Sequence, residues 1–238
     1  MSNTRTQILD GIRRSLKRGP LDQAAARALE MRLERPLRGP VPARTRGLDR
    51  DGLVELFERL AREVNATVVR VRDLDAVPDA VADFLATHNL PADMAMAPDP
   101  LLDRVPWHKR PLLNLRRGRS HGQDAVGLSA AFAGIAETAT LMLASGADSP
   151  STLNFLPETH VVVLPAARVV GPIEDAWDRL RATQPGEQLA GPTMPRTVNF
   201  ITGPSRTGDI EQKILMGAHG PRRLHIVIVE DESAGAQP

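Results

Sequence analysis

The sequence has no cysteine among its 238 residues. A chain without thiols cannot form a disulfide, use a cysteine nucleophile or bind an iron–sulfur cluster through thiolates. We therefore expect no cofactor bound through cysteine, and the sequence leaves any other cofactor open.

The sequence also lacks an excess of charge of either sign. Its 27 arginines and 3 lysines nearly balance 29 acidic residues, so the formal net charge is +1. No global field would draw such a protein to nucleic acid or to an anionic membrane surface. We expect neither as a partner.

Long apolar runs are missing as well. The longest nearly uncharged run, 125–147, contains Glu137 and many small residues, which suit buried strands better than a membrane span. The first 19 residues lack the apolar region of a signal peptide. Since 42% of the residues are hydrophobic and 25% charged, we expect a cytoplasmic protein without membrane insertion.

The histidines show no metal-binding pattern. They form neither an i, i+4 pair nor an HxH group, and we expect no metal site. His121 and His219 fall in loops near expected strand ends and are candidates for the rim of a pocket. The six positions are 88, 108, 121, 160, 219 and 225.

The chain is expected to have two parts. Apolar residues at helical spacing predict helices over 4–17 and 21–33, before a segment rich in proline and glycine. We interpret 1–45 as an N-terminal helical appendage that packs on the main domain or on a partner, and 46–238 as an α/β domain.

Helices and strands are expected to alternate from residue 48. The pattern predicts helices over 53–64 and 77–90 and strands over 66–71 and 93–97, followed by a loop-rich excursion at 98–120. Such alternation predicts a mostly parallel sheet flanked by helices.

A small-residue stretch at 131–145 is expected to form two strands or one bent strand. Glu137 and Thr138 would lie at the bend. A carboxylate there can act as nucleophile or general base, or it can accept hydrogen bonds that fix the turn. Both interpretations of Glu137 stay open.

The last long stretch predicts a βαβ unit. Apolar runs at 198–202 and 224–229 indicate parallel strands, and Ile210, Ile214 and Leu215 recur at helical spacing between them. The loop 203–208 would then lie at the carboxyl end of a strand, where α/β sheets place their ligands.

Residues of this loop are candidates for an anion site. Arg206 offers a planar fork for a carboxylate or phosphate, while Ser205 and Thr207 can cap the expected helix. Asp209 and Glu211 would favour the helix N-terminus through its dipole. The alternative is a capped loop with a solvated arginine.

Three blocks carry a resemblance to a known family. GIAETATL at 134–141, HVVVLPAARVV at 160–170 and TGPSRTGDIEQKILMGAHGPRRLHIVIVED at 202–231 resemble the lactate-utilisation protein C family (LutC/YkgG type, LUD domain). The family motif usually reads AETGT, and Ala139 stands here where glycine is expected.

The resemblance implies a fold like that of the NagB/RpiA/CoA-transferase group. It also implies a role in oxidising L-lactate to pyruvate, as a subunit without a cluster beside iron–sulfur partner proteins. Two alternatives stay open: an independent enzyme of isomerase or CoA/acyl-transfer type acting on an anionic metabolite, and a module that senses a carboxylate. The site hypothesis is Glu137 as the catalytic carboxylate, with a ligand bound by Thr138, Ser205, Arg206, Thr207 and Asp209.

Overall fold

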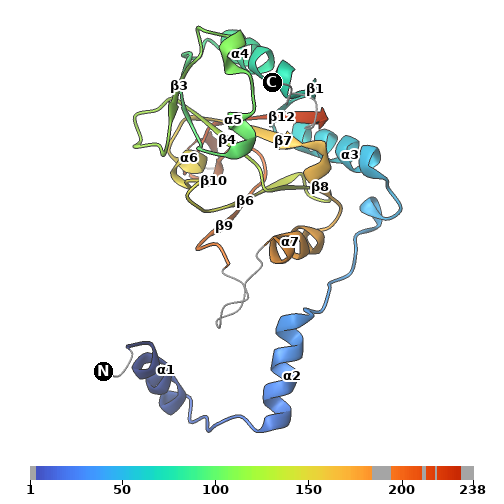
Figure 1. Ribbon diagram of the computed structural model, residues 1–238, viewed down its shortest axis with the longest axis vertical. Coiled ribbons are helices and arrows are strands. Elements are labelled where there is room, and N and C mark those ends of the chain that lie inside the picture. The colour runs from blue at the N-terminus through green and yellow to red at the C-terminus, as the bar shows by residue number, and fades with distance from the viewer. Residues whose placement is uncertain (1–3, 184–193, 211–212, 218, 232–238) are drawn as a thin grey trace. The chain divides into compact units, whose positions relative to one another are not determined.

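The computed structural model describes residues 4–183, 194–210, 213–217 and 219–231, with the backbone alone at 207–210 and 213–215. The chain divides into two compact units, 1–40 and 41–238. Figure 1 shows the order of the elements along the chain.

The first unit contains the two helices expected there, α1 (Thr4–Ser15) and α2 (Gln23–Glu34). The Asp22 side chain begins α2 by accepting the Ala25 N–H at 2.7 Å, which satisfies one of the free amides of the first turn. Neither helix contains a buried residue.

The second unit is built around a six-stranded sheet in which every neighbouring pair is parallel. The strand order is β1-β12-β7-β4-β2-β3, so β12 and β7 run side by side in the middle (Figure 1). The strands are β1 (Thr67–Asp73), β2 (Asp93–Met96), β3 (Asn114–Arg117), β4 (Val126–Ala130), β7 (Thr159–Pro165) and β12 (Arg223–Asp231). The expected mostly parallel α/β architecture is confirmed.

A second sheet of four short strands, in the order β8-β5-β6-β9, packs against the first. The antiparallel pair β5–β6 comes from the small-residue stretch, and Glu137 and Thr138 lie in the turn between them, as expected. The strands are β5 (Ala133–Ile135), β6 (Thr140–Ala144), β8 (Val169–Val170) and β9 (Val198–Ile201).

Helices cover both faces of the large sheet. The α-helices are α3 (Arg50–Glu63), α4 (Val77–Thr87), α5 (Pro100–Asp103), α6 (Thr152–Phe155) and α7 (Ile173–Ala182). Four 3-10 turns complete the described elements: η1 (Ala43–Thr45), η2 (Leu74–Ala76), η3 (Trp107–Lys109) and η4 (Ala166–Arg168). Among the described helices, none combines the length and the apolar character that crossing a bilayer requires.

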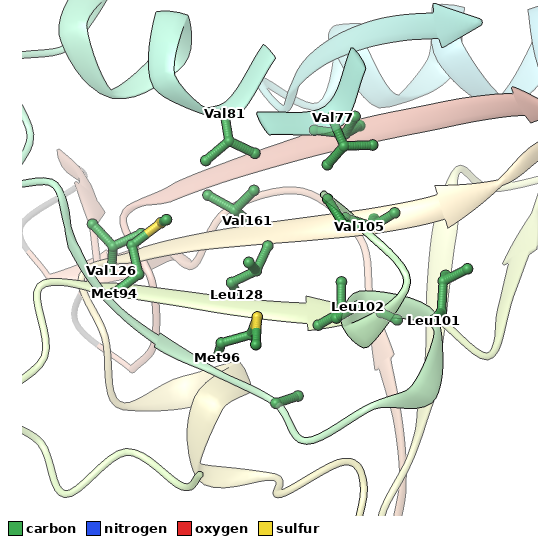
Figure 2. Packing of buried hydrophobic residues seen from close by; sticks show 14 of the residues in the cluster. Val77, Val81, Met94, Met96, Leu101, Leu102, Val105, Val126, Leu128 and Val161 are labelled. Carbon is green, nitrogen blue, oxygen red and sulfur yellow. The ribbon is translucent and has the colours of Figure 1, made fainter. Parts of the chain in front are cut away.

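Alternate residues of the central strands face opposite sides, as the two-residue period of a strand requires. Figure 2 shows one face, where Val77 and Val81 of α4 lie over Val161 of β7 and Leu128 of β4. On the opposite face, Val162 and its same-face neighbours pack against α3 and the small sheet. All seven residues of β7 are buried.

The prediction of a helix between 198–202 and 224–229 is wrong. The described residues there form a two-stranded antiparallel hairpin, β10 (Arg206–Ile210) and β11 (Lys213–Met216). β9 pairs with β6 in the small sheet instead of standing parallel to β12. Three apolar residues within a six-residue span cannot distinguish a helix from a hairpin, and two of them are β-branched isoleucines.

We predict that Phe57→Ala lowers the free energy of unfolding by about 3–5 kcal/mol, because truncating a buried phenylalanine leaves a cavity. The Phe57 side chain is fully buried between α3 and the two sheets. Urea denaturation measures the change. Leu112→Ala is the control, since Leu112 is 87% exposed, and should change stability by no more than about 0.5 kcal/mol.

Candidate functional site

A cavity of about 400 Å³ lies beside the amino ends of β7 and β12, where β9 leads into the hairpin. His160 and Leu224 line it from the second positions of those two strands. The other lining residues are Asn154, Phe155, Phe200, Ile201, Thr202, Gly203, Pro204, Ser205, Arg206, His219, Gly220 and Pro221. The expected loop therefore does line a cavity, but at the amino edge of the parallel sheet.

Backbone hydrogen bonds hold the two loops of this wall together. The Ser205 N–H donates to the Pro221 carbonyl at 2.8 Å, and the Gly217 N–H donates to the Ser205 carbonyl at 2.9 Å. Gly203 has φ +70°, and a Cβ there would lie 2.6 Å from the Val64 carbonyl oxygen. Only glycine fits this turn, which seats the loop on the end of α3.

The inner wall carries two buried polar side chains. Asn154 is 2% exposed, His160 is fully buried, and His160 Nε2 lies 2.7 Å from the Ser129 hydroxyl. Burial lowers the pKa of His160 to about 3, so its ring is neutral at physiological pH. Gly127 lets α6 approach, because a Cβ there would lie 2.9 Å from the Leu153 carbonyl oxygen.

Several polar atoms around this wall have no hydrogen-bond partner. In the described part of the chain, six buried side-chain atoms lack one, and four of them fall on residues 152–160. A buried polar atom without a partner costs about 1–3 kcal/mol, so such a concentration beside a cavity calls for an explanation. The six are Thr152 Oγ1, Asn154 Oδ1, Thr159 Oγ1, His160 Nδ1, Asn199 Nδ2 and His225 Nε2.

The outer part of the cavity is cationic and aromatic. Arg206 is exposed, and no ion pair joins it to the described residues. His219, a rim candidate from the sequence, lines the cavity, and its backbone N–H donates to the Ser205 hydroxyl at 3.4 Å. Phe155 and Phe200 are 43% and 38% exposed and give the opening apolar walls.

Thr138 is connected to the cavity through a chain of hydroxyl groups. Its Oγ1 lies 2.7 Å from that of Thr140, which lies 2.6 Å from the Oγ1 of Thr202. Thr202 lines the cavity, whereas Thr138 does not. The two stretches selected from the sequence therefore meet across the small sheet, where β6 pairs with β9.

Comparison with known proteins agrees with this fold. A family model described as the LUD domain matches residues 54–229, well over half of the chain. The chain belongs to the LUD domain family.

Two relatives named lactate utilization protein C match part of the chain. Those of Geobacillus thermodenitrificans and Bacillus subtilis are 34% and 33% identical over 110 residues, covering 46% of this chain and 44% of each relative. The matched part thus spans less than half the length of these relatives. A crystal structure of a DUF162 family protein from Deinococcus radiodurans has a TM-score of 0.56 at 22% identity and covers 76% of this chain and 99% of that chain. At this identity the likeness concerns the fold alone.

Within the LUD domain, Glu137 lies apart from the residues that line the cavity. Its carboxylate accepts the Ile173 N–H at 2.9 Å at the start of α7, and its carbonyl accepts a hydrogen bond from Arg44 at 3.1 Å. These contacts join the β5–β6 turn to α7 and η1. A catalytic role for Glu137 stays a prediction.

Of the other predicted site residues, Ser205 and Arg206 lie together on the cavity wall. Thr207 and Asp209 belong to β10, but their side chains lie outside the described residues, as does Glu211. Asn154 is not among the residues predicted from the sequence, and His160 was considered there only as one of six scattered histidines. The available signal was the polar pair Thr159–His160 at the start of the apolar run Val161–Leu164.

The carboxyl edge of the sheet, where a ligand was expected, holds a different arrangement. Asp99 follows β2 and accepts the Leu101 N–H at 2.8 Å, at the start of α5. Burial raises the pKa of Asp99, against the opposing effects of that hydrogen bond and of the Arg168 charge. The described residues contain no group of three or more histidine or acidic side chains that could hold a metal ion.

We predict that the LUD domain loses stability as the pH falls below about 6.5, the ordinary pKa of histidine. Burial lowers the pKa of His225 to about 4, with smaller contributions from His88 and Arg62, and that of His160 to about 3. Between pH 6.5 and these values the unfolded chain binds more protons, so acid favours unfolding. The full effect at His225 is about 3 kcal/mol.

Urea denaturation at a series of pH values between 7 and 4 measures this dependence. His225→Gln is expected to weaken it, because the buried imidazole is gone. His108→Gln, which replaces an exposed histidine, should leave it unchanged. An equal slope in all three proteins would contradict the prediction.

We predict that Glu137→Ala lowers the free energy of unfolding by about 1 kcal/mol, since the Ile173 N–H loses its acceptor. Glu137→Gln keeps an acceptor oxygen and should retain most of that stability. The same glutamine variant tests the catalytic hypothesis. If lactate oxidation is measured in an assembly that contains this chain, a wild-type rate would exclude a reacting carboxylate at this position. A lost rate with unchanged stability would support one.

Proposed function

We propose that this chain acts in lactate utilisation by binding a small organic anion in the cavity described above. In this proposal it is the subunit without a cluster, in an assembly with iron–sulfur partner proteins. Membership in the LUD domain family and the similarity to relatives named lactate utilization protein C support the metabolic role. The cavity supports the binding role.

The observation that carries the proposal is that one cavity has Arg206 at its rim and neutral polar side chains on its inner wall. A guanidinium group binds a carboxylate through two parallel hydrogen bonds. The neutral His160 and Asn154 add no charge that would repel an anion. The cavity volume of about 400 Å³ is also within the usual range of small-molecule sites, roughly 300–1,000 Å³.

Lactate oxidation can be divided between chains, because binding the acid and accepting its electrons are separate tasks. Converting lactate to pyruvate removes two electrons and two protons, and an assembly needs a group that accepts the electrons. This chain has no cysteine with which to hold an iron–sulfur cluster, so in this proposal the clusters belong to partner chains. Here the chain's own contribution is to bind and orient the acid.

The positions of the acidic side chains favour binding over independent catalysis. Isomerase or acyl-transfer chemistry through a carboxylate needs that group beside the substrate. Glu137 instead contacts the start of α7, and no acidic residue lines the cavity among the described residues. The cavity is also larger than a three-carbon acid needs, which leaves space for water or a second ligand.

We predict that Arg206→Ala weakens L-lactate binding about tenfold, the effect of losing 1.4 kcal/mol of interaction. Calorimetric titration of the purified chain with L-lactate and pyruvate measures the affinity. Thermal shift gives a second readout, because ligand at a hundred times Kd adds about 2.7 kcal/mol of stability.

Arg59→Ala is the matched control for this experiment. Arg59 is an exposed arginine on α3 that pairs with Glu63 and does not line the cavity. Its loss should leave the affinity for lactate unchanged. Equal binding by the wild type and the Arg206→Ala variant would show that Arg206 does not hold the acid.

A further inference from the structure

The charged residues are unevenly distributed along this chain, although its net charge is only +1. Residues 1–40 contain nine arginine and lysine residues and four acidic ones, whereas 41–238 contain 21 and 25. The first compact unit therefore has a net charge of +5, and the rest of the chain −4. The expectation that no anionic surface attracts this protein was based on the total charge and does not address this local excess.

The first helix of this unit, α1, has its large apolar residues on one side. At 3.6 residues per turn they fall within about 100° of the helix circumference. The four are Ile8, Leu9, Ile12 and Leu16, which are 59%, 37%, 50% and 55% exposed. A continuous stripe of exposed aliphatic side chains marks a surface that binds something.

The opposite side of α1 is basic. A hollow of about 470 Å³ is bordered there by Gln7, Asp10, Arg13, Arg14 and Arg18, and by none of the four apolar residues. Asp10 is the one acidic residue among the first 20, and its carboxylate lies 2.7 Å from the Arg13 guanidinium. The hollow therefore keeps a net positive charge.

The end of α1 is an ordered turn that carries more positive charge. Lys17 has φ +51°, and its N–H donates to the Arg14 carbonyl at 3.1 Å. The Arg18 N–H donates to the Arg13 carbonyl at 3.0 Å. These two bonds close the helix in a Schellman motif. Lys17 and Arg18 thus directly follow Leu16, the last residue of the apolar stripe.

We propose that α1 docks on a membrane surface that contains anionic lipids, with its apolar stripe among the outer acyl chains and its cations at the lipid phosphates. The inference goes beyond the proposed function and does not rest on it, since α1 lies outside the residues 54–229 matched by the LUD domain. The 12 residues of α1 extend roughly 18 Å, too short to cross a hydrocarbon core of about 30 Å. The helix therefore lies in the plane of the interface.

Two features favour a lipid surface over an acidic groove on a protein. The stripe is wholly aliphatic, and the first aromatic residue of the chain is Phe57, whereas protein interfaces are anchored mainly by tryptophan, tyrosine and arginine in fitted pockets. The cations are also spread around the remaining circumference instead of facing one direction. A plane of phosphates accommodates this spread, because long arginine and lysine side chains can reach sideways to it.

The second helix, α2, supplies the matched control. It also exposes aliphatic side chains, such as Leu29 at 45%. However, its two arginines, Arg27 and Arg32, are balanced by two glutamates within the same helix. Interfacial binding draws on apolar burial and on attraction to anionic lipid together, so we expect α2 to contribute little to it.

The test is co-sedimentation of the purified full chain with vesicles of phosphatidylcholine alone, or of phosphatidylcholine and phosphatidylglycerol in equal amounts. Wild-type protein should bind the mixed vesicles about tenfold or more tightly than the neutral ones, and added salt should weaken this binding. The double variant Arg14→Glu/Arg18→Glu should lose about tenfold or more in affinity for the mixed vesicles. Arg27→Glu/Arg32→Glu makes the same change in net charge on α2 and should retain wild-type affinity.

A second pair of variants tests the apolar stripe. Ile12→Ser should weaken binding to the mixed vesicles about tenfold, because one isoleucine no longer enters the acyl region. Leu29→Ser, at a similarly exposed position on α2, should bind as the wild type does. Since all these positions are exposed, urea denaturation should show the LUD domain unchanged in every variant.

The remaining outcomes would overturn the proposal. Wild-type protein that does not bind the mixed vesicles would point to a protein as the occupant of this stripe. An equal loss in the two double variants would show an effect of net charge alone, without a role for α1. Lactate titration of the Arg14→Glu/Arg18→Glu variant should match the wild type, which keeps this test separate from that of the anion site.

Discussion

The structure depends on the burial of β7 and β12 on both faces. These two strands occupy the middle of a parallel sheet, with α4 and α5 on one side and α3 and the small sheet on the other. Water cannot reach polar groups in such strands, so each group must find a partner within the protein or remain unpaired. His160 and His225 meet this constraint on opposite faces, and burial keeps both neutral.

The same constraint explains where the cavity forms. At the amino edge of the sheet, Gly127 admits the backbone of α6, and Gly203 seats the loop after β9 on the end of α3. β9 of the small sheet and residues 219–221 close the remaining sides. The cavity thus lies between the large sheet and the elements packed on it. Its buried polar side chains, Asn154 and His160, belong to α6 and β7, whose apolar residues pack in the core.

The periodic parts of this fold could be predicted from sequence, and the cavity could not. The strand Thr159–Pro165 contains the continuous apolar run Val161–Leu164, and helices such as Arg50–Glu63 show a clear apolar face. Ala139, at the position where the family motif has glycine, adopts φ +51°, so the motif does mark a left-handed turn. By contrast, the few apolar residues of β10 and β11 fit a helix as well as a hairpin. The wall around His160 depends on a contact with Ser129, 31 residues away, which local spacing does not encode.

The arrangement of charge gives the cavity a direction that a simple anion site would not have. A cluster of arginines would hold any small anion, with little regard for its remaining atoms. Here Arg206 is the one arginine or lysine among the described lining residues, and the inner wall carries the neutral side chains of Asn154 and His160. An anion held at Arg206 would therefore lie with its charge toward the opening and its uncharged atoms toward the neutral wall.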